Sequence, residues 1–195
     1  MKRMILVIAG VLAALAFASA ASFIYVTSNV ETPKYTVVER DGDIEIRDYP
    51  SLRVAEIDRA GSRNGSANAA FRPLASYIFA RKRDGEKISM TAPVTQQDNG
   101  GSWTVQFIMP AQYSLADLPK PDNGEIRLRE LPAQRRVAIR FSGRATDALF
   151  DMKEDELKKW LQKRGLSVSG KPTYAYYNDP FTPGFLRRNE VLFDL

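Results

Sequence analysis

The chain repeats one order of predicted elements, and this repeat limits the fold more than any other feature of the sequence. In the first half, residues 52–59 read as a half-buried strand and residues 67–83 carry apolar side chains at helical spacing. Two alternating stretches follow, at residues 88–92 and 103–109. The second half has the same order of strand, helix, strand and strand, at residues 136–142, 146–164, 173–177 and 190–195. Two such units can pair their strands into one sheet or one barrel, with both helices outside.

Local signals support this division. Arg53-Val54-Ala55 opens the first unit and Arg136-Val137-Ala138 opens the second. Asp41-Gly42 predicts a two-residue hairpin turn, because glycine adopts positive φ at low cost. The strands predicted beside these signals lie at residues 37–40, 44–48 and 126–131.

The helices carry their own signals. Gly165 stands where the second helix should stop. Pro73 lies inside the first helix, so either a first turn begins there or the helix bends. The carboxylates at residues 151–156 favour a solvated helix face over a metal site, since acidic residues complement the start of a helix.

Composition excludes several classes of function. The 195 residues include no histidine and no cysteine, so the chain has no disulfide, thiolate nucleophile, Ser-His-Asp triad or histidine-ligated metal. Carboxylates, lysine and tyrosine are the remaining catalytic groups, and no arrangement of them indicates an enzyme. The net charge of +5 is small and its charges are interleaved, so no nucleic-acid partner is expected.

The first residues have the pattern of a targeting segment. Lys2 and Arg3 precede an apolar run from Met4 to Val26, which contains Ala18-Ser19-Ala20. Residues 1–28 therefore predict either a cleaved signal peptide or an uncleaved membrane anchor. Both place the domain, residues 33–195, outside the cytoplasm, in the periplasm or anchored to the inner membrane and facing outward.

Three motifs carry a family resemblance. Lys87-Ile88-Ser89-Met90-Thr91-Ala92-Pro93-Val94 resembles the K-I-x-M-T-x-P-V signature of the SOUL haem-binding family. Residues 180–191, which contain Arg187-Arg188-Asn189-Glu190-Val191, resemble its P-x-x-P…R-R-N-E-V ending, and residues 35–40 resemble its opening. In order, the three span residues 33–195.

The motifs themselves have mainly structural interpretations. Pro93 cannot donate to a strand ladder and marks an edge or the end of a strand. Arg187 or Arg188 is expected to pair with Glu190 or to cap nearby carbonyl groups.

The resemblance implies a fold and a function. The fold is α+β, with duplicated β-α-β-β units forming a distorted antiparallel eight-stranded barrel and two helices outside. The function is non-enzymatic binding of haem or a related tetrapyrrole, as a carrier or buffer, near the first helix. Such a flat apolar ligand with two carboxylates needs an apolar floor and one or two cations at the rim, and its iron need not be ligated.

The first helix offers residues for such a site. If Phe71 and its helical neighbours face the core, the adjacent face carries Arg72, Ser76, Phe79 and Arg83. Phe79 could then stack on a planar ligand while Arg72 or Arg83 meets a carboxylate.

The sequence departs from the family pattern at the residues expected to contact the ligand. Without histidine, Tyr77 and Met90 are the first candidates for an iron ligand, followed by Met109 and the tyrosines at 174–177. The family's basic positions for the propionates align with Ala69, Tyr77 and Thr182, none of which is basic.

An alternative function stays open. The duplicated architecture also resembles effector-binding domains of the gyrase-inhibitor type, which hold a small hydrophobic molecule in a cleft between the repeats. A buried acidic residue in that cleft, with Glu56 and Glu190 as candidates, would favour this alternative. An exposed apolar groove beside the first helix would favour haem.

Overall fold

The computed structural model describes residues 30–195. The predicted signal peptide or membrane anchor at residues 1–28 lies outside the described residues, so both hypotheses about it stay predictions. Within the described part, no helix is both long enough and apolar enough to cross a membrane.

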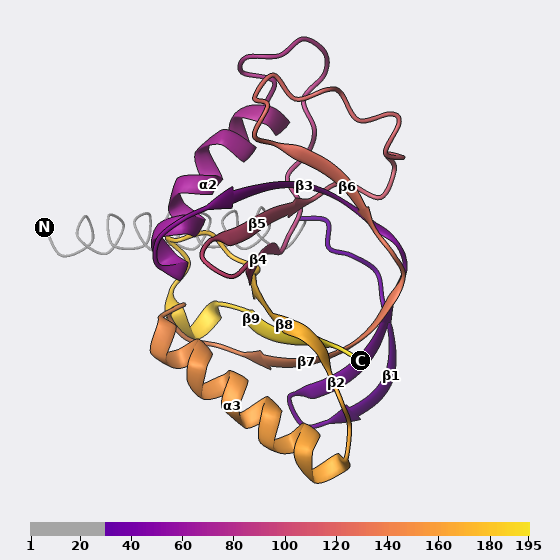
Figure 1. Cartoon of the computed structure of the whole chain (residues 1–195), viewed down its shortest axis with the longest axis vertical. Helices are drawn as coiled ribbons and strands as arrows, with labels where there is room; N and C mark the ends of the chain where they lie inside the picture. The colour runs from indigo at the N-terminus through magenta and orange to yellow at the C-terminus, as the bar shows by residue number, and fades with distance from the viewer. Residues whose placement is uncertain (1–29) are drawn as a thin grey trace, which may run out of the picture. The chain divides into compact units, whose positions relative to one another are not determined.

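Nine strands, two α-helices and one 3-10 turn make up this part of the chain (Figure 1). In chain order they are β1 (Thr36–Asp41), β2 (Ile44–Tyr49), β3 (Leu52–Arg59), α2 (Arg63–Ile78), β4 (Val94–Asp98), β5 (Trp103–Ile108), β6 (Arg127–Leu131), β7 (Gln134–Phe141), α3 (Asp147–Arg164), β8 (Ser169–Tyr176), η1 (Gly184–Leu186) and β9 (Asn189–Asp194).

The strands form one antiparallel sheet in the order β1-β2-β7-β9-β8-β4-β5-β3-β6. The predicted α+β class with two helices is confirmed, but the eight-stranded barrel is wrong in strand number and in closure. A barrel needs its outer strands to hydrogen-bond with each other. Here β1 pairs with β2 alone and all six of its residues are exposed, so the sheet stays open.

The strand pairing follows the duplicated order of elements. In the first unit β5 lies between β3 and β4, and in the second β9 lies between β7 and β8. Strands β4 and β8 pair at the centre of the sheet. The strand before each unit crosses to the other one, so that β2 pairs with β7 and β6 pairs with β3. Each half of the sheet is thus completed by a strand from the other half.

The two Arg-Val-Ala triplets mark the start of each unit correctly. The residues at matching positions of the two triplets, however, do not face the same side of the sheet. Val137 lies in the core under α3, whereas Ala55 and Ile57, and not Val54, lie in the core under α2. Successive residues of a strand face opposite sides of the sheet. The two triplets are therefore out of step by one residue.

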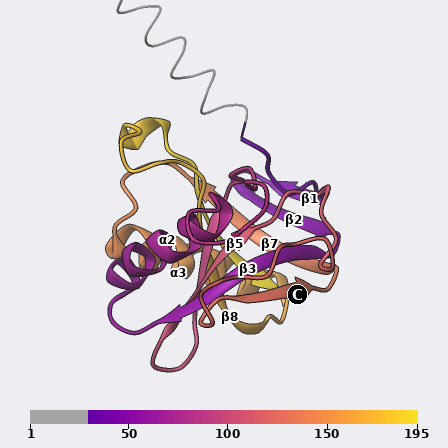
Figure 2. The ribbon, with the colours of Figure 1, turned by 90° about the horizontal axis from the view of Figure 1, so that it is seen from above.

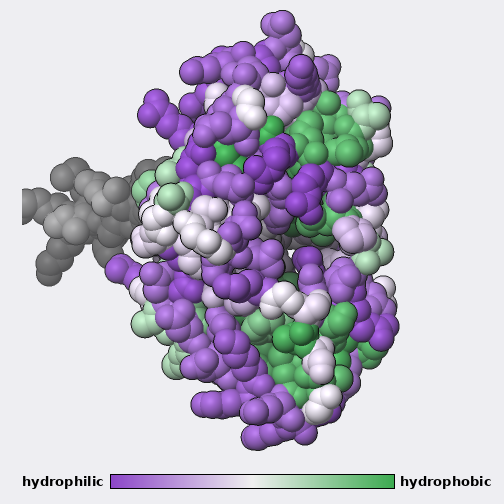
Figure 3. Space-filling view, in the orientation of Figure 1, coloured by the Kyte–Doolittle hydropathy of each residue, from purple (hydrophilic) through white to green (hydrophobic). Residues whose placement is uncertain are grey.

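Both helices cover the same face of the sheet. Helix α2 packs on β3 and β5, and α3 packs on β7 and β9. Val94 under α2 and Tyr176 under α3 are cross-strand partners, so their side chains share one face. The two ribbon views agree with this arrangement (Figures 1 and 2), and hydrophobic residues show mainly in two areas of the surface view (Figure 3).

Helix α2 begins and ends earlier than the predicted residues 67–83. Its start is capped by Ser62, whose hydroxyl accepts a hydrogen bond from the Gly65 N–H at 3.2 Å. It runs through Pro73 and ends at Ile78, and Ala80 then has a positive φ of 49°. Helix α3 matches its predicted range, with Thr146 as N-cap and Gly165 in the left-handed conformation.

The strand predicted at residues 88–92 is absent. Ile88 is buried in the core, but its N–H donates to Ile78 O, the last carbonyl of α2, at 2.7 Å rather than to a neighbouring strand. The strand begins only at Val94, directly after Pro93, and β4 pairs on both of its sides. The prediction that this proline marks an edge or the end of a strand is therefore wrong, because it precedes the first residue of a central strand. The alternating apolar residues of this motif therefore reflect which side chains are buried, and not the hydrogen-bonded pairing of a strand.

A buried ion pair lies on the face opposite the helices. The side chains of Arg47 on β2 and Glu190 on β9 are 1% and 0% exposed, and their groups meet through two hydrogen bonds of 2.8 and 3.1 Å. Arg188 donates to the same carboxylate at 2.8 Å, and the Tyr177 hydroxyl donates to it at 2.9 Å. Of the alternatives that the sequence left open for Arg187 and Arg188, the structure thus shows Arg188 paired with Glu190.

The pair belongs to a larger polar cluster. Arg47 also donates to Glu45 at 2.7 Å and to the Tyr49 hydroxyl at 3.1 Å. Burial by itself would raise the pKa of Glu190, but hydrogen bonding to Arg47 and the charges of Arg47 and Arg188 bring that pKa below its ordinary value of 4.5.

A second cluster joins the helices. Arg63 at the start of α2 donates to the carboxylates of Asp147 and Asp151 on α3, both at 3.0 Å, and stacks over the Tyr174 ring at 4.4 Å. Asp151, expected on a solvated helix face, therefore binds the other unit. Residues 31–195 contain all three hydrophobic clusters and both polar clusters, so this part has what a domain needs to fold alone.

We expect Glu190→Gln to lower the free energy of unfolding by roughly 3 kcal/mol, because it removes the buried carboxylate shared by Arg47 and Arg188 and leaves Arg47 paired with Glu45 alone. Urea unfolding followed by circular dichroism measures this. The control is Glu125→Gln, which removes an exposed partner of Arg59 and should have a much smaller effect, because solvent screens an exposed ion pair. Equal losses would contradict the role given to the pair.

The same pair predicts a pH dependence. Because the folded pKa of Glu190 is lowered, its contribution is complete above the unfolded pKa of 4.5 and is lost as the pH falls through the folded pKa. The difference in unfolding free energy between the native chain and Glu190→Gln should therefore shrink below pH 4.5. A difference that stays constant down to about pH 3 would show that Glu190 does not titrate with folding.

Candidate functional site

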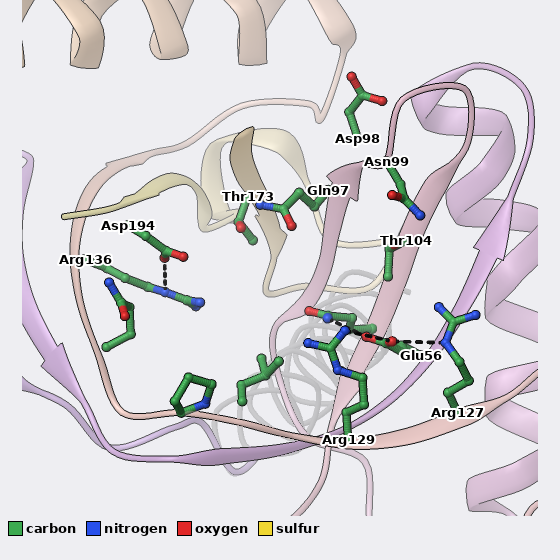
Figure 4. Close-up of a pocket in the computed structure, with 14 residues that line it drawn as sticks. Glu56, Gln97, Asp98, Asn99, Thr104, Arg127, Arg129, Arg136, Thr173 and Asp194 are labelled. Carbon is green, nitrogen blue, oxygen red and sulfur yellow. Dashed lines mark hydrogen bonds and ion pairs between the residues drawn. The ribbon is translucent and has the colours of Figure 1, made fainter. Parts of the chain in front are cut away.

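The face of the sheet away from the helices holds a cleft of about 340 Å³ between the two units (Figure 4). Residues from β3, β4, β5, β6, β7, β8 and β9 line it. Its charged residues are Glu56, Asp98, Arg127, Arg129, Arg136 and Asp194.

Glu56 is the buried acidic residue of this cleft. It is 1% exposed and accepts hydrogen bonds from Gln106 at 2.9 Å, Arg127 at 3.2 Å and Arg129 at 3.4 Å. Figure 4 shows both arginines reaching toward it from β6. Glu190, the other acidic candidate, belongs to the buried cluster with Arg47 and does not line the cleft.

The other charges of the cleft are also paired. Arg136 donates to Asp194 at 2.7 Å, and Lys171 donates to Asp98 at 2.6 Å. The lining is therefore mainly hydrophilic, and its two apolar residues, Leu131 and Pro132, offer little surface to a flat hydrophobic ligand. It is better matched to a small molecule with charges of its own.

A second concavity, the helix hollow, lies between α2 and the loop that joins β8 to β9. Its volume is about 530 Å³, which is within the range of roughly 300–1,000 Å³ usual for small-molecule sites. It is lined by two asparagines of α2 (Asn64 and Asn68), by Arg144 after β7, and by residues 180–184 and 187 of the loop. Figure 2 shows this loop projecting beyond the helices.

The loop is held by its own hydrogen bonds. Asp179 accepts from the N–H of Phe181 at 2.8 Å and from the hydroxyl of Thr182 at 2.9 Å, and Arg187 donates to Thr182 O at 2.7 Å. Burial would raise the pKa of Asp179, but these hydrogen bonds to Thr182 and Phe181 lower it. Arg187 thus caps loop carbonyls, as its motif predicted.

This loop presents apolar side chains to solvent. Phe181, which lines the helix hollow, is 89% exposed. Across the hollow, Phe71 and Arg72 lie one helical turn beyond Asn68 on α2 and are exposed. Arg72 and Arg144 form no ion pair with any residue of the described part, so both guanidinium groups are available to an anion.

The four predicted ligand residues are not brought together. Arg72 is exposed on α2, but Ser76 and Phe79 are half-buried and Phe79 packs against the core. Arg83 lies beyond the end of the helix, where it donates to the carbonyls of Tyr77, Asp84 and Glu86, each at 2.8 Å. Because α2 ends at Ile78, the helix face that was expected to carry Arg72, Ser76, Phe79 and Arg83 does not extend to Arg83.

The candidate iron ligands also lie away from the helix hollow. Tyr77 is fully buried and its hydroxyl donates to Pro119 O at 2.8 Å. Burial raises the pKa of Tyr77 to about 12. Met90 packs against the core under α2, Met109 is buried, and Tyr174 lies in the core under α3.

Sequence reasoning missed Phe181, Arg144 and Arg187 as lining residues of one site. Two of them stand in the P-x-x-P ending that was interpreted as structural, and exposed phenylalanines beside prolines were the available signal. Nothing in the spacing shows that this loop approaches α2, which lies more than a hundred residues earlier.

The family model described as "SOUL heme-binding protein" matches residues 30–194. No curated protein matches the chain. Among solved structures, the chain is similar to the EcmrR C-terminal domain, with a TM-score of 0.60, 14% identity, and 82% of this chain and 96% of that one covered.

A hydrolase from Listeria innocua is similar as well, with a TM-score of 0.55, 11% identity, and coverage of 80% of this chain and 93% of that one. At these identities the likeness shows the fold alone.

Proposed function

Because the chain belongs to the SOUL heme-binding protein family, we propose that its folded domain binds haem or a related tetrapyrrole in the helix hollow. The observation that carries this proposal is the solvent-exposed Phe181 beside α2, with Arg144 on the same hollow and Arg72 one helical turn away. A tetrapyrrole is a flat apolar ring with two carboxylates, and these residues supply an apolar surface and cations for it.

The iron has no ligand in this site. Among the described residues, the lining of the hollow includes no histidine, cysteine, methionine or tyrosine. Binding would therefore rest on contact with the ring and on the propionates. Metal-free protoporphyrin should then bind about as well as ferric haem.

The proposed role is binding without catalysis, as a carrier or buffer outside the cytoplasm. The absence of histidine and cysteine from the chain supports it, since these residues supply most covalent and acid–base chemistry near neutral pH. The apolar run at residues 4–26 supports export, either to the periplasm or tethered to the inner membrane.

A second candidate function is binding of a small effector in the cleft between the units. The observation that favours it is the buried carboxylate of Glu56 at the base of that cleft. Since Arg127 and Arg129 already pair with Glu56, a charged or polar molecule suits the cleft better than the hydrophobic one expected from sequence.

An absorbance titration of residues 31–195 with ferric haem, beside protoporphyrin, tests the first proposal. We expect a saturable shift of the Soret band at one equivalent and affinities within about threefold for the two ligands. Phe181→Ala should weaken both by about tenfold, because it removes the exposed ring. Arg129→Ala, in the cleft, is the control and should change neither affinity.

Two results would overturn this assignment. A linear response without saturation would contradict tetrapyrrole binding and give priority to the cleft. A loss of haem affinity in Phe79→Ala but not in Phe181→Ala would place the site on the face of the first helix that the sequence predicted, around Arg72 and Phe79.

A further inference from the structure

The loop between β8 and β9 exposes more apolar surface than the helix hollow uses. Phe185 is 78% exposed and Leu186 is 55% exposed, and neither lines the hollow. Their backbone is ordered by the 3-10 turn, in which the Leu186 N–H donates to Pro183 O at 2.9 Å. Two large hydrophobic side chains on a hydrogen-bonded loop mark a surface that contacts something apolar.

The loop lies at the end of the sheet where the described chain enters. The N–H of Ala92 donates to Glu31 O at 2.9 Å, and Glu31 forms a parallel bridge with Thr91. Two residues after Ala92, Val94 pairs with Tyr176 at the end of β8, just before the loop. In Figure 2 the indigo start of the described chain and the loop both lie on the upper side of the domain.

The sequence supplies a reason for this end to meet a membrane. The apolar run that ends at Val26 is only five residues from Glu31, and five extended residues reach at most about 18 Å. If residues 1–28 stay as an anchor, this end of the domain is held within that distance of the bilayer.

The charges beside the loop fit an anionic surface. Arg144 is exposed and follows Gly143, whose N–H donates to Gly184 O at 2.9 Å, so Arg144 stands directly against the loop. Its guanidinium forms no ion pair within the described part of the chain. Apolar side chains flanked by arginine are typical of segments that lie in the interface of a bilayer.

We propose that Phe185 and Leu186 insert into the surface of an anionic bilayer, with Arg144 at the lipid phosphates. The helix hollow, on the same loop, would then open beside the membrane. Phe185 and Leu186 do not line the hollow, so their contact with the bilayer does not depend on the proposed tetrapyrrole binding. Arg144 lines the hollow as well and is shared by the two proposals.

Co-sedimentation of residues 31–195 with vesicles tests the proposal in the absence of any tetrapyrrole. We expect binding to vesicles of phosphatidylcholine with phosphatidylglycerol, and at least about tenfold weaker binding to phosphatidylcholine alone or at high salt. The double variant Phe185→Ser, Leu186→Ser should reduce partitioning by at least about tenfold. Arg144→Gln should reduce it by about fivefold.

The control is Leu166→Ser, Val168→Ser. These exposed apolar residues precede β8, whose first residue, Ser169, pairs with Asp194 at the opposite end of the sheet. Their replacement should leave partitioning unchanged.

Three results would overturn the proposal. They are no binding of the native domain to anionic vesicles, equal loss in the control variant, and self-association in solution that the Phe185 and Leu186 changes abolish without any vesicle binding. The last would make the loop an interface between copies of the chain. Haem titration of the double variant Phe185→Ser, Leu186→Ser tests the helix hollow separately. Its haem affinity should equal that of the native domain.

Discussion

The ion pair of Arg47 and Glu190 ties together parts of the chain that are 143 residues apart. Its two strands, β2 and β9, lie on either side of β7. Ala138 of β7, buried on the same face, has a side chain small enough for Arg47 to reach across. Because an unpaired charge in this position is costly, the pairing of β2, the strand before the first unit, with β7 of the second unit also places Arg47 where Glu190 can neutralise it. The pair thus links the duplicated units into one domain.

The two faces of the sheet have different physical roles. The helix-covered face holds the two larger hydrophobic cores, while the opposite face carries a small third cluster, the buried pair of Arg47 and Glu190, and the polar cleft. The groups suited to a flat apolar ligand lie on neither face. They lie at the junction of α2 with the loop after β8, where Phe181 is exposed and does not contribute to the packing of the core.

Several parts of this arrangement were predictable because they depend on local chemistry. Gly165 ends α3 since it accepts positive φ, and Gly42 forms the tight turn between β1 and β2 for the same reason. The end of α2 was not predictable. The apolar spacing continues past Ile78 into residues that fill the core without being helical, and a pattern of burial does not distinguish the two cases.

By itself, the sequence determined the order of elements, the family and the exclusion of histidine and cysteine chemistry, because motifs and composition are properties of the chain. Tertiary structure alone decided that the sheet is open, that Arg83 binds backbone carbonyls, and that the arginine with free donors at the hollow is Arg144. Which strands become edges and which loops meet a helix depend on pairing across long separations. The spacing of residues along one chain does not contain that information.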